Sequence, residues 1–150
     1  MLPTRVLNAL NLGRAMAARV ETGEAGWTAW MLVQPVVSSE STWDALRQRW
    51  TFHRMATAQF QPPQRFLVRY TRLNEVHLEA ERRGRLDLAM RADRPEDWVV
   101  VASDVDEVER LVRRFIDDLE AIQLPAAVDY PEPPPAFARQ RTLEDLLGTT

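Results

Sequence analysis

The side chains best suited to acid–base chemistry are two histidines, His53 and His77. His53 shares a sector with Trp50 in segment 42–60, whose apolar spacing predicts a helix. It is therefore either a neutral, hydrogen-bonded side chain at the margin of the core or a general base in a cleft. A small-ligand or enzymatic pocket around His53 and Trp50 is one alternative function. His77 alternates outward beside Glu79 on a predicted strand, so we expect it in a surface pair.

No motif for metal, nucleotide or nucleophilic chemistry is present. The chain has no cysteine, and its two histidines form no H-x-x-x-H or H-E-x-x-H pattern. Its five glycines are too scattered for a phosphate-binding loop or a dinucleotide fingerprint, and no G-x-S-x-G elbow occurs. We predict no metal and no cofactor, and we lean toward a protein that is not an enzyme.

Every basic residue is an arginine, and acids outnumber the arginines to give a formal net charge of −3. The arginines gather in one predicted hairpin turn and beside the tryptophans of segment 42–60. Basic side chains interleaved with aromatic ones can bind single-stranded nucleic acid through phosphate contacts and base stacking. The residues of this nucleic-acid alternative are Arg47, Arg54, Arg82, Arg83 and Arg85. A charged turn that keeps the hairpin soluble is the simpler interpretation of the turn arginines.

Large apolar residues suggest a different use for segment 42–60. Four of the five tryptophans lie between Trp27 and Trp50, where they either fill the core or form an exposed anchor patch. Phe52 and Met55 fall outside the apolar stripe of the predicted helix, so they should point away from the main core. They then need another partner, and Trp43 belongs to the same candidate surface.

The end of the chain resembles a docking peptide in its pattern. Residues 129–135 are rich in proline, which predicts an extended polyproline II segment. A short helix should follow, with Thr142 and Asp145 as a capping box. It is too short to persist alone, so the tail either docks in a groove or is disordered. Its candidate partner-binding residues are Phe137, Leu143, Leu146 and Leu147.

The elements that must position these side chains follow from apolar periodicity and capping residues. Helices are expected over 4–20, with Thr4 as N-cap, over 42–60, and from the cap Ser103 to about 123. Strands are expected over 27–34, 66–71, 76–81, 86–91 and 98–102. Three consecutive valines predict a central position for the last strand. The stripe of the third helix must lie on the sheet; it contains Val105, Val108, Leu111, Val112, Phe115, Leu119 and Ile122.

These patterns predict an α+β fold: a four- to five-stranded, mostly antiparallel sheet packed by two or three helices, with a Pro-rich C-terminal tail ending in a short helix. We expect one domain over 1–124, then a linker and docking segment over 125–150. No apolar run is long enough to span a membrane, so a cytoplasmic protein is expected. The preferred function is a non-catalytic protein–protein interaction module, such as an adaptor, assembly factor, secretion chaperone or toxin-neutralising partner. Its partner would be another protein or a second copy of the chain, and not a membrane.

Overall fold

The computed structural model describes residues 1–36, 65–92 and 95–148. Its strands are β1 (Met16–Val20), β2 (Trp27–Val36), β3 (Arg65–Asn74), β4 (Glu96–Ala102) and β5 (Arg139–Arg141). Its α-helices are α1 (Thr4–Asn11), α4 (Glu75–Arg82), α5 (Leu86–Ala92), α6 (Val105–Val112) and α7 (Leu143–Leu147). Short 3₁₀ turns are η1 (Leu119–Ala121), η2 (Pro125–Val128) and η3 (Pro135–Phe137). The helix predicted over 42–60 lies outside the described residues.

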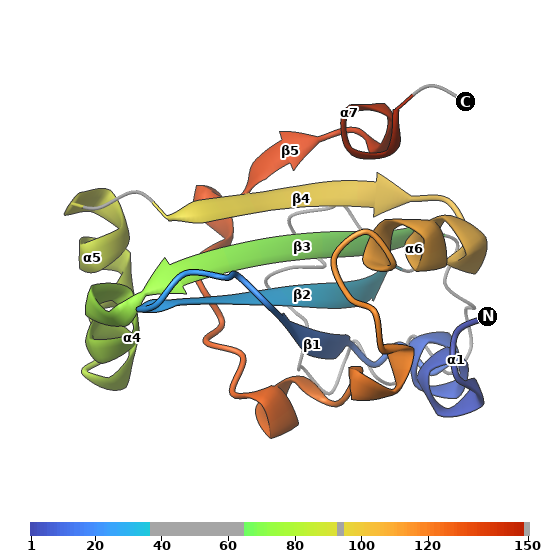
Figure 1. Ribbon diagram of the computed structural model, residues 1–150, viewed down its shortest axis with the longest axis horizontal. Helices are drawn as coiled ribbons and strands as arrows, with labels where there is room; N and C mark the ends of the chain where they lie inside the picture. The colour runs from blue at the N-terminus through green and yellow to red at the C-terminus, as the bar shows by residue number, and fades with distance from the viewer. Residues whose placement is uncertain (37–64, 93–94, 149–150) are drawn as a thin grey trace.

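The described strands form one sheet in the order β1-β2-β3-β4-β5 (Figure 1). The first four are antiparallel, and β5 runs parallel to β4. The ladder between β2 and β3 is the longest, because both strands have ten residues and pair over their whole length. The predicted α+β fold, with a mostly antiparallel sheet, a Pro-rich tail and a C-terminal helix, is confirmed.

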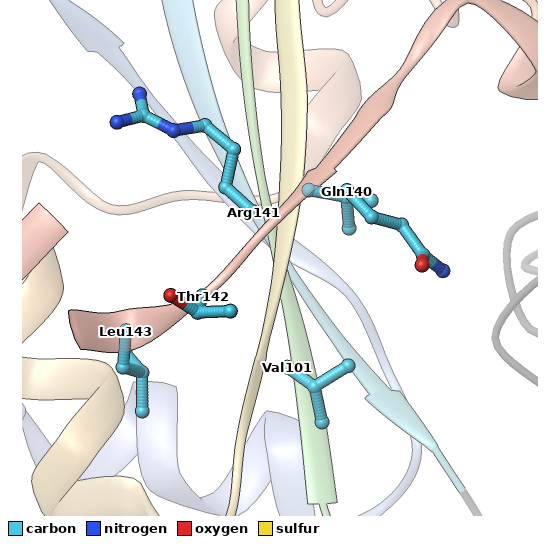
Figure 2. A pocket seen from close by; sticks show the side chains of 6 residues that line it. Val101, Gln140, Arg141, Thr142 and Leu143 are labelled. Carbon is cyan, nitrogen blue, oxygen red and sulfur yellow. The ribbon is translucent and has the colours of Figure 1, made fainter. Parts of the chain in front are cut away.

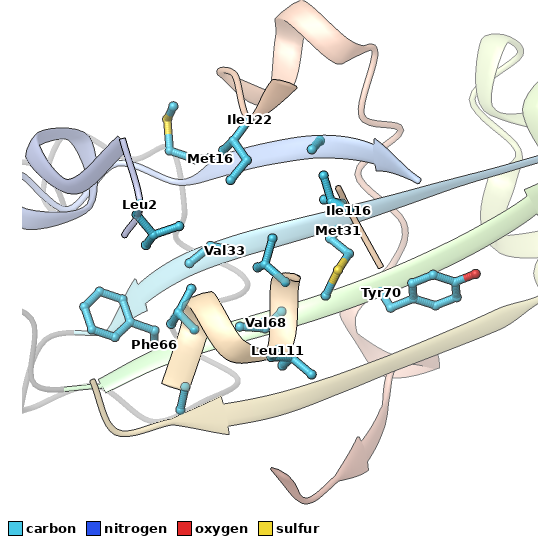
Figure 3. Packing of buried hydrophobic residues seen from close by; sticks show 14 of the residues in the cluster. Leu2, Met16, Met31, Val33, Phe66, Val68, Tyr70, Leu111, Ile116 and Ile122 are labelled. Carbon is cyan, nitrogen blue, oxygen red and sulfur yellow. The ribbon is translucent and has the colours of Figure 1, made fainter. Parts of the chain in front are cut away.

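Helices α1 and α6 cover one face of the sheet, which we call the front face (Figure 1). Side chains from α6 and from the strands meet there in a continuous apolar core (Figure 3). The best-buried members on the strands include Met31, Val33, Val68 and Val100. All seven residues of the predicted stripe from Val105 to Ile122 belong to this core or pack against it. The stripe therefore lies on the sheet, as predicted.

The chain forms the stripe with a shorter helix than predicted. Helix α6 ends at Val112, and the later apolar residues reach the core from turns and from η1. The N-cap is Asp104, whose side chain accepts from the Glu107 N–H at 2.9 Å, and not Ser103. Ser103 instead donates its backbone N–H to the Glu107 carboxylate. The prediction of one long helix was wrong because an apolar stripe records burial and does not require unbroken helix geometry.

The helix predicted over 4–20 was also wrong in its second half. Helix α1 ends at Asn11, Gly13 adopts a φ of 81°, and the chain continues as strand β1. Pro3, rather than Thr4, occupies the N-cap position. Val20 suits the helical period counted from α1, but it also alternates with Arg19 as a strand requires. Glycine at a left-handed φ decides between the two patterns, because other residues rarely adopt it.

The strands predicted over 76–81 and 86–91 are helices α4 and α5. Asn74 caps α4 by accepting the His77 N–H at 3.0 Å, and the His77 ring accepts the Asn74 N–H at 3.2 Å. His77 is 0% exposed, so its predicted surface position was wrong. Segments this short can match both the two-residue repeat of a strand and the 3.6-residue repeat of a helix. The hydrogen bonds between Asn74 and His77 favour the helix. Leu86 and Met90, four residues apart, pack together toward the back of the sheet.

Gly84 joins α4 to α5 with a φ of 69°. A Cβ built there meets nothing within 4 Å, so alanine would introduce backbone strain without a clash. We expect Gly84→Ala to lower the free energy of unfolding by about 1–2 kcal/mol, measured by urea denaturation. Gly84→Asn should cost less, because asparagine tolerates this conformation better. Equal stability of Gly84→Ala and the parent chain would contradict the expectation.

Among the described helices, none combines the length and apolar character that crossing a bilayer requires.

Candidate functional site

The C-terminal segment crosses the back face of the sheet, opposite α1 and α6. We call residues 125–138 the strap. In Figure 1 the strap runs, in orange to red, behind the sheet from the side of β1 to the side of β4, where it continues into β5. Tyr130, Pro131, Pro133 and Ala138 are buried against that face. The tail is therefore packed on the fold over 125–148, and the disordered alternative is not what the structure contains.

Side chains of the sheet hold the start of the strap by its backbone. The Trp30 indole Nε1–H donates to the Val128 carbonyl at 2.7 Å, and Arg19 Nε donates to the same oxygen at 3.3 Å. Arg19 also pairs with the exposed Asp129 carboxylate at 3.0 Å. Trp30 is buried among apolar side chains, so its N–H requires such an acceptor.

A buried ion pair holds the middle of the strap. Arg69 on β3 and Asp97 on β4 are each 3% exposed and make two hydrogen bonds, 2.6 and 2.9 Å long. The remaining guanidinium donors reach the Pro133 carbonyl at 3.1 Å and the Pro134 carbonyl at 3.0 Å. Thr71 Oγ1 donates to Asp97 at 3.4 Å. This bidentate pair thus fixes the guanidinium while it binds two successive proline carbonyls.

Burial dominates the electrostatics of this pair. It raises the pKa of Asp97 above its ordinary value, and the hydrogen bonds and charge of Arg69 oppose the rise. The carboxylate therefore depends on its arginine to stay charged inside the protein. A hollow of about 550 Å³ opens beside Asp97; its lining residues are Met90, Arg91, Pro95, Asp97, Ala136, Phe137 and Arg139.

After the strap, the chain reaches the edge of the sheet, where β5 pairs with only three residues of β4. Because β5 stops there, Val101 has no β5 residue opposite it and is 41% exposed. A groove of about 240 Å³ follows, which we call the edge groove (Figure 2). Its lining residues are Val99, Val101, Gln140, Arg141, Thr142 and Leu143. The groove thus combines an apolar wall with polar side chains of β5.

Helix α7 bounds the edge groove and is anchored at both ends. Thr142 and Asp145 form the predicted capping box, with hydrogen bonds of 3.2 and 3.3 Å. Arg114 donates to the Leu147 carbonyl at 3.1 Å, and the Arg141 guanidinium lies 5.6 Å from the ring centre of Trp98. These contacts keep a five-residue helix in place although it is too short to be stable alone.

The structure brings the predicted tail residues to two places. Leu143, Leu146 and Leu147 are half-buried against the front core, beside the edge groove. Phe137 packs against the back-face cluster instead. Their predicted role in binding a partner remains a prediction, and each already has an intramolecular contact.

The nucleic-acid alternative finds little support among its described residues. Arg82 and Arg83 lie at the end of α4, and both pair with Glu79, at 3.5 and 3.1 Å. Arg85 is exposed in the turn before α5. The other candidates predicted for the aromatic surface, the pocket and nucleic acid lie outside the described residues; they are Trp43, Arg47, Trp50, Phe52, His53, Arg54 and Met55. Across 1–36, 65–92 and 95–148, no three His, Asp or Glu side chains cluster as metal ligands would.

Sequence reasoning did not single out Arg69, Asp97 or Trp30, which hold the strap. On its strand Arg69 shares a face with Thr71 and with the apolar Leu67 and Leu73. An arginine and a threonine between two leucines on one face are a weak signal of a buried polar cluster. Nothing local predicts that residues 64 positions further along the chain supply its acceptors.

Comparison with known proteins identified no relative. No protein-family model matches the chain, and no curated protein and no solved structure is significantly similar to it. The function must therefore be argued from the geometry.

Proposed function

We propose that the chain is a non-catalytic protein–protein interaction module that binds another protein at the edge groove. The observation that carries the proposal is the open end of β4, where exposed Val101 lines a groove together with half-buried Leu143 of α7. An extended segment of a partner can add to such an edge by backbone hydrogen bonds, and a pocket beside it selects a side chain. Residues 125–150 would form the docking segment of the module and residues 1–124 its body.

The charges of β5 favour a different protein over a second copy. Antiparallel pairing of two β5 strands about Gln140 would place Arg139 of each copy opposite Arg141 of the other. Like charges directly opposite one another destabilise a strand pair. A partner segment with acidic residues at those positions would be attracted instead. The expected partner therefore presents an extended segment with one apolar side chain for the groove and acidic residues beside it.

Two exposed valines provide a matched test. Val101→Gln changes the wall of the edge groove, whereas Val76→Gln changes an exposed valine on α4 that is 64% exposed. Both substitutions should alter stability by only about 0.5 kcal/mol or less. We expect Val101→Gln to reduce the yield of a protein captured by the parent chain about tenfold, and Val76→Gln to leave it unchanged.

The capture is made from the native cell with the full chain as bait, and bound proteins are quantified by mass spectrometry. Equal yields with both variants would contradict the proposal, even if a protein is captured. Loss of binding together with a large loss of stability would mean that Val101 is a core residue.

A further inference from the structure

The strap satisfies its own backbone only in part, within its two 3₁₀ turns. Prolines 131, 133, 134 and 135 have no N–H, so this stretch cannot form a regular ladder of hydrogen bonds. Its carbonyls still need donors where they are buried. Segments of this kind are recognised in other proteins by grooves that supply aromatic surfaces and side-chain donors.

The back face of the sheet supplies such donors from three side chains. Trp30 and Arg19 donate to Val128, and Arg69 donates to Pro133 and Pro134. Every one of these hydrogen bonds ends on a main-chain oxygen. The contacts therefore recognise main-chain carbonyls and no particular side chain, and another chain that presents its carbonyls at the same places can make them.

Asp97 orients the Arg69 side chain for donation to the strap. Asp97 holds two of its nitrogens from the neighbouring strand, and the donors left over point to the strap carbonyls. If the strap left, the site would open to water, and these donors would exchange the strap carbonyls for solvent. Because Asp97 would still hold the guanidinium, the donors stay arranged for another carbonyl-bearing segment.

The strap is bound in a conformation that carries strain. Asp129 and Glu132 have φ values of 53° and 52°, and they are the only non-glycine residues with positive φ in the described part of the chain. Such a backbone costs free energy for residues with a side chain. Only three residues of β5 then tie the tail to the ladder of the sheet. A proline-rich segment that avoids the left-handed conformations would bind the same donors with less strain.

From these contacts we infer that the back face, around Trp30, Arg69 and Asp97, is a binding groove for a proline-rich segment of a partner protein, and that the strap fills it as an internal competitor. The inference deepens the proposed function and rests on its statement that the chain binds another protein. The two surfaces adjoin, since Val99 lines the edge groove and packs with Ala138 of the strap, but Val101 donates and accepts none of the hydrogen bonds that hold the strap.

The test makes the strap exchangeable at the loss of one turn hydrogen bond, from the Ala127 N–H to the Leu124 carbonyl. A protease site is inserted after Leu124, an exposed residue just before η2, in the full chain, and the chain is then cut. An isotope-labelled peptide of residues 127–138 is added, and its binding is followed by native mass spectrometry. We expect saturable binding to the cut protein and at least tenfold weaker binding to the uncut chain, because the tether gives the strap a high effective concentration.

Three variants assign the binding to the groove. Trp30→Phe removes one hydrogen-bond donor and should weaken binding of the peptide several-fold. The double substitution Arg69→Gln with Asp97→Asn removes the guanidinium that donates to the strap carbonyls and leaves no lone buried charge. It should weaken binding of the peptide about tenfold or more. Arg85→Gln removes an exposed charge elsewhere and should change nothing. The double variant is used only if its near-ultraviolet circular dichroism matches the parent; otherwise Trp30→Phe decides.

The outcomes are exclusive. Binding of the 127–138 peptide that depends on Trp30 or on Arg69 supports the inference. Four results would overturn it: no binding to the cut protein, equal binding of a scrambled peptide, unfolding of the body when its own tail leaves, or competition only by a peptide of residues 139–150. None of these results bears on capture through Val101, so failure here is distinguishable from failure of the edge-groove proposal.

Discussion

Replacing Arg69 by methionine is expected to lower the free energy of unfolding by about 3–5 kcal/mol at neutral pH. The substitution leaves the Asp97 carboxylate 3% exposed and without its bidentate partner. It also removes the donors of two strap carbonyls. Urea denaturation followed by tryptophan fluorescence measures the loss.

The loss should depend on pH in a definite direction. Without Arg69, the pKa of Asp97 in the folded protein rises further above its unfolded value, which is about 3.9. The folded state then binds the proton more tightly, so the variant is least destabilised below that value and loses stability as pH rises through the folded pKa. A destabilisation that grows as pH falls would contradict this account of the pair.

Two controls test whether the loss comes from the unpaired buried charge of Asp97. Arg72→Met removes an arginine from the same strand that pairs with Glu24 at 2.5 Å and stacks on Trp27 at the surface. It should cost only about 1–2 kcal/mol. Adding Asp97→Asn to Arg69→Met should recover part of the stability, because no buried charge is then left unpaired. No recovery would mean that the strap contacts, rather than the ion pair, carry the energy.

Trp98→Ala is the second substitution with a large expected effect. Its ring stacks on Tyr70 with centroids 5.2 Å apart and meets Phe115 at 5.7 Å. It is 1% exposed, so truncation leaves a cavity in the front core and should cost about 3–5 kcal/mol. Arg141 also loses the ring on which it lies, so β5 should be loosened as well.

Another tryptophan gives the matched control. Trp27 is half-exposed at the start of β2, where it contacts Arg72 and the edge of His77. Trp27→Ala should cost about 1–2 kcal/mol, since it loses surface contacts and creates no closed cavity. Amide hydrogen exchange at Gln140 should rise in Trp98→Ala and not in Trp27→Ala. Similar losses for both variants would contradict the difference in burial.

Some parts of the fold could be predicted from the sequence, because the local residue pattern fits only one kind of secondary structure. The strands around Met31, Val68 and Val99 combine β-branched or apolar runs with clear ends, and all three are present. The Thr142–Asp145 capping box likewise formed as predicted. In each case the neighbouring residues alone distinguish strand from helix.

Short amphipathic segments whose pattern fits both a strand and a helix were predicted wrongly. Residues 75–92 alternate well enough for two strands, yet the Asn74 cap and the i,i+4 spacing of Leu86 and Met90 favour helices. Residues 16–20 present the opposite error, because Gly13 breaks a pattern that is periodic on either side of it. Tertiary packing selects between such patterns, and a local window does not contain that information.

The candidate site was the part least accessible to prediction. The tail leucines were predicted from their spacing to bind a partner, which stays a prediction; they pack against the front core, and Leu143 also lines the edge groove. The Arg69 cluster was missed because its meaning depends on acceptors in Pro133 and Pro134, far along the chain. The proline-rich segment was expected to be an extended polyproline II linker. The structure differs, because Asp129 and Glu132 adopt left-handed conformations and carbonyls of the segment accept from donors on the sheet.

The proposal that the edge groove binds another protein is tested most directly by a photo-crosslinking amino acid at Gln140, which lines the groove. The same amino acid at exposed Val76 on α4 serves as the control position. Both proteins are expressed in the native cell, irradiated and analysed by mass spectrometry. We predict a protein adduct that forms from position 140, maps to an extended segment with acidic residues, and is absent from position 76. Adducts at neither position, or the same adducts at both, would contradict the proposed function.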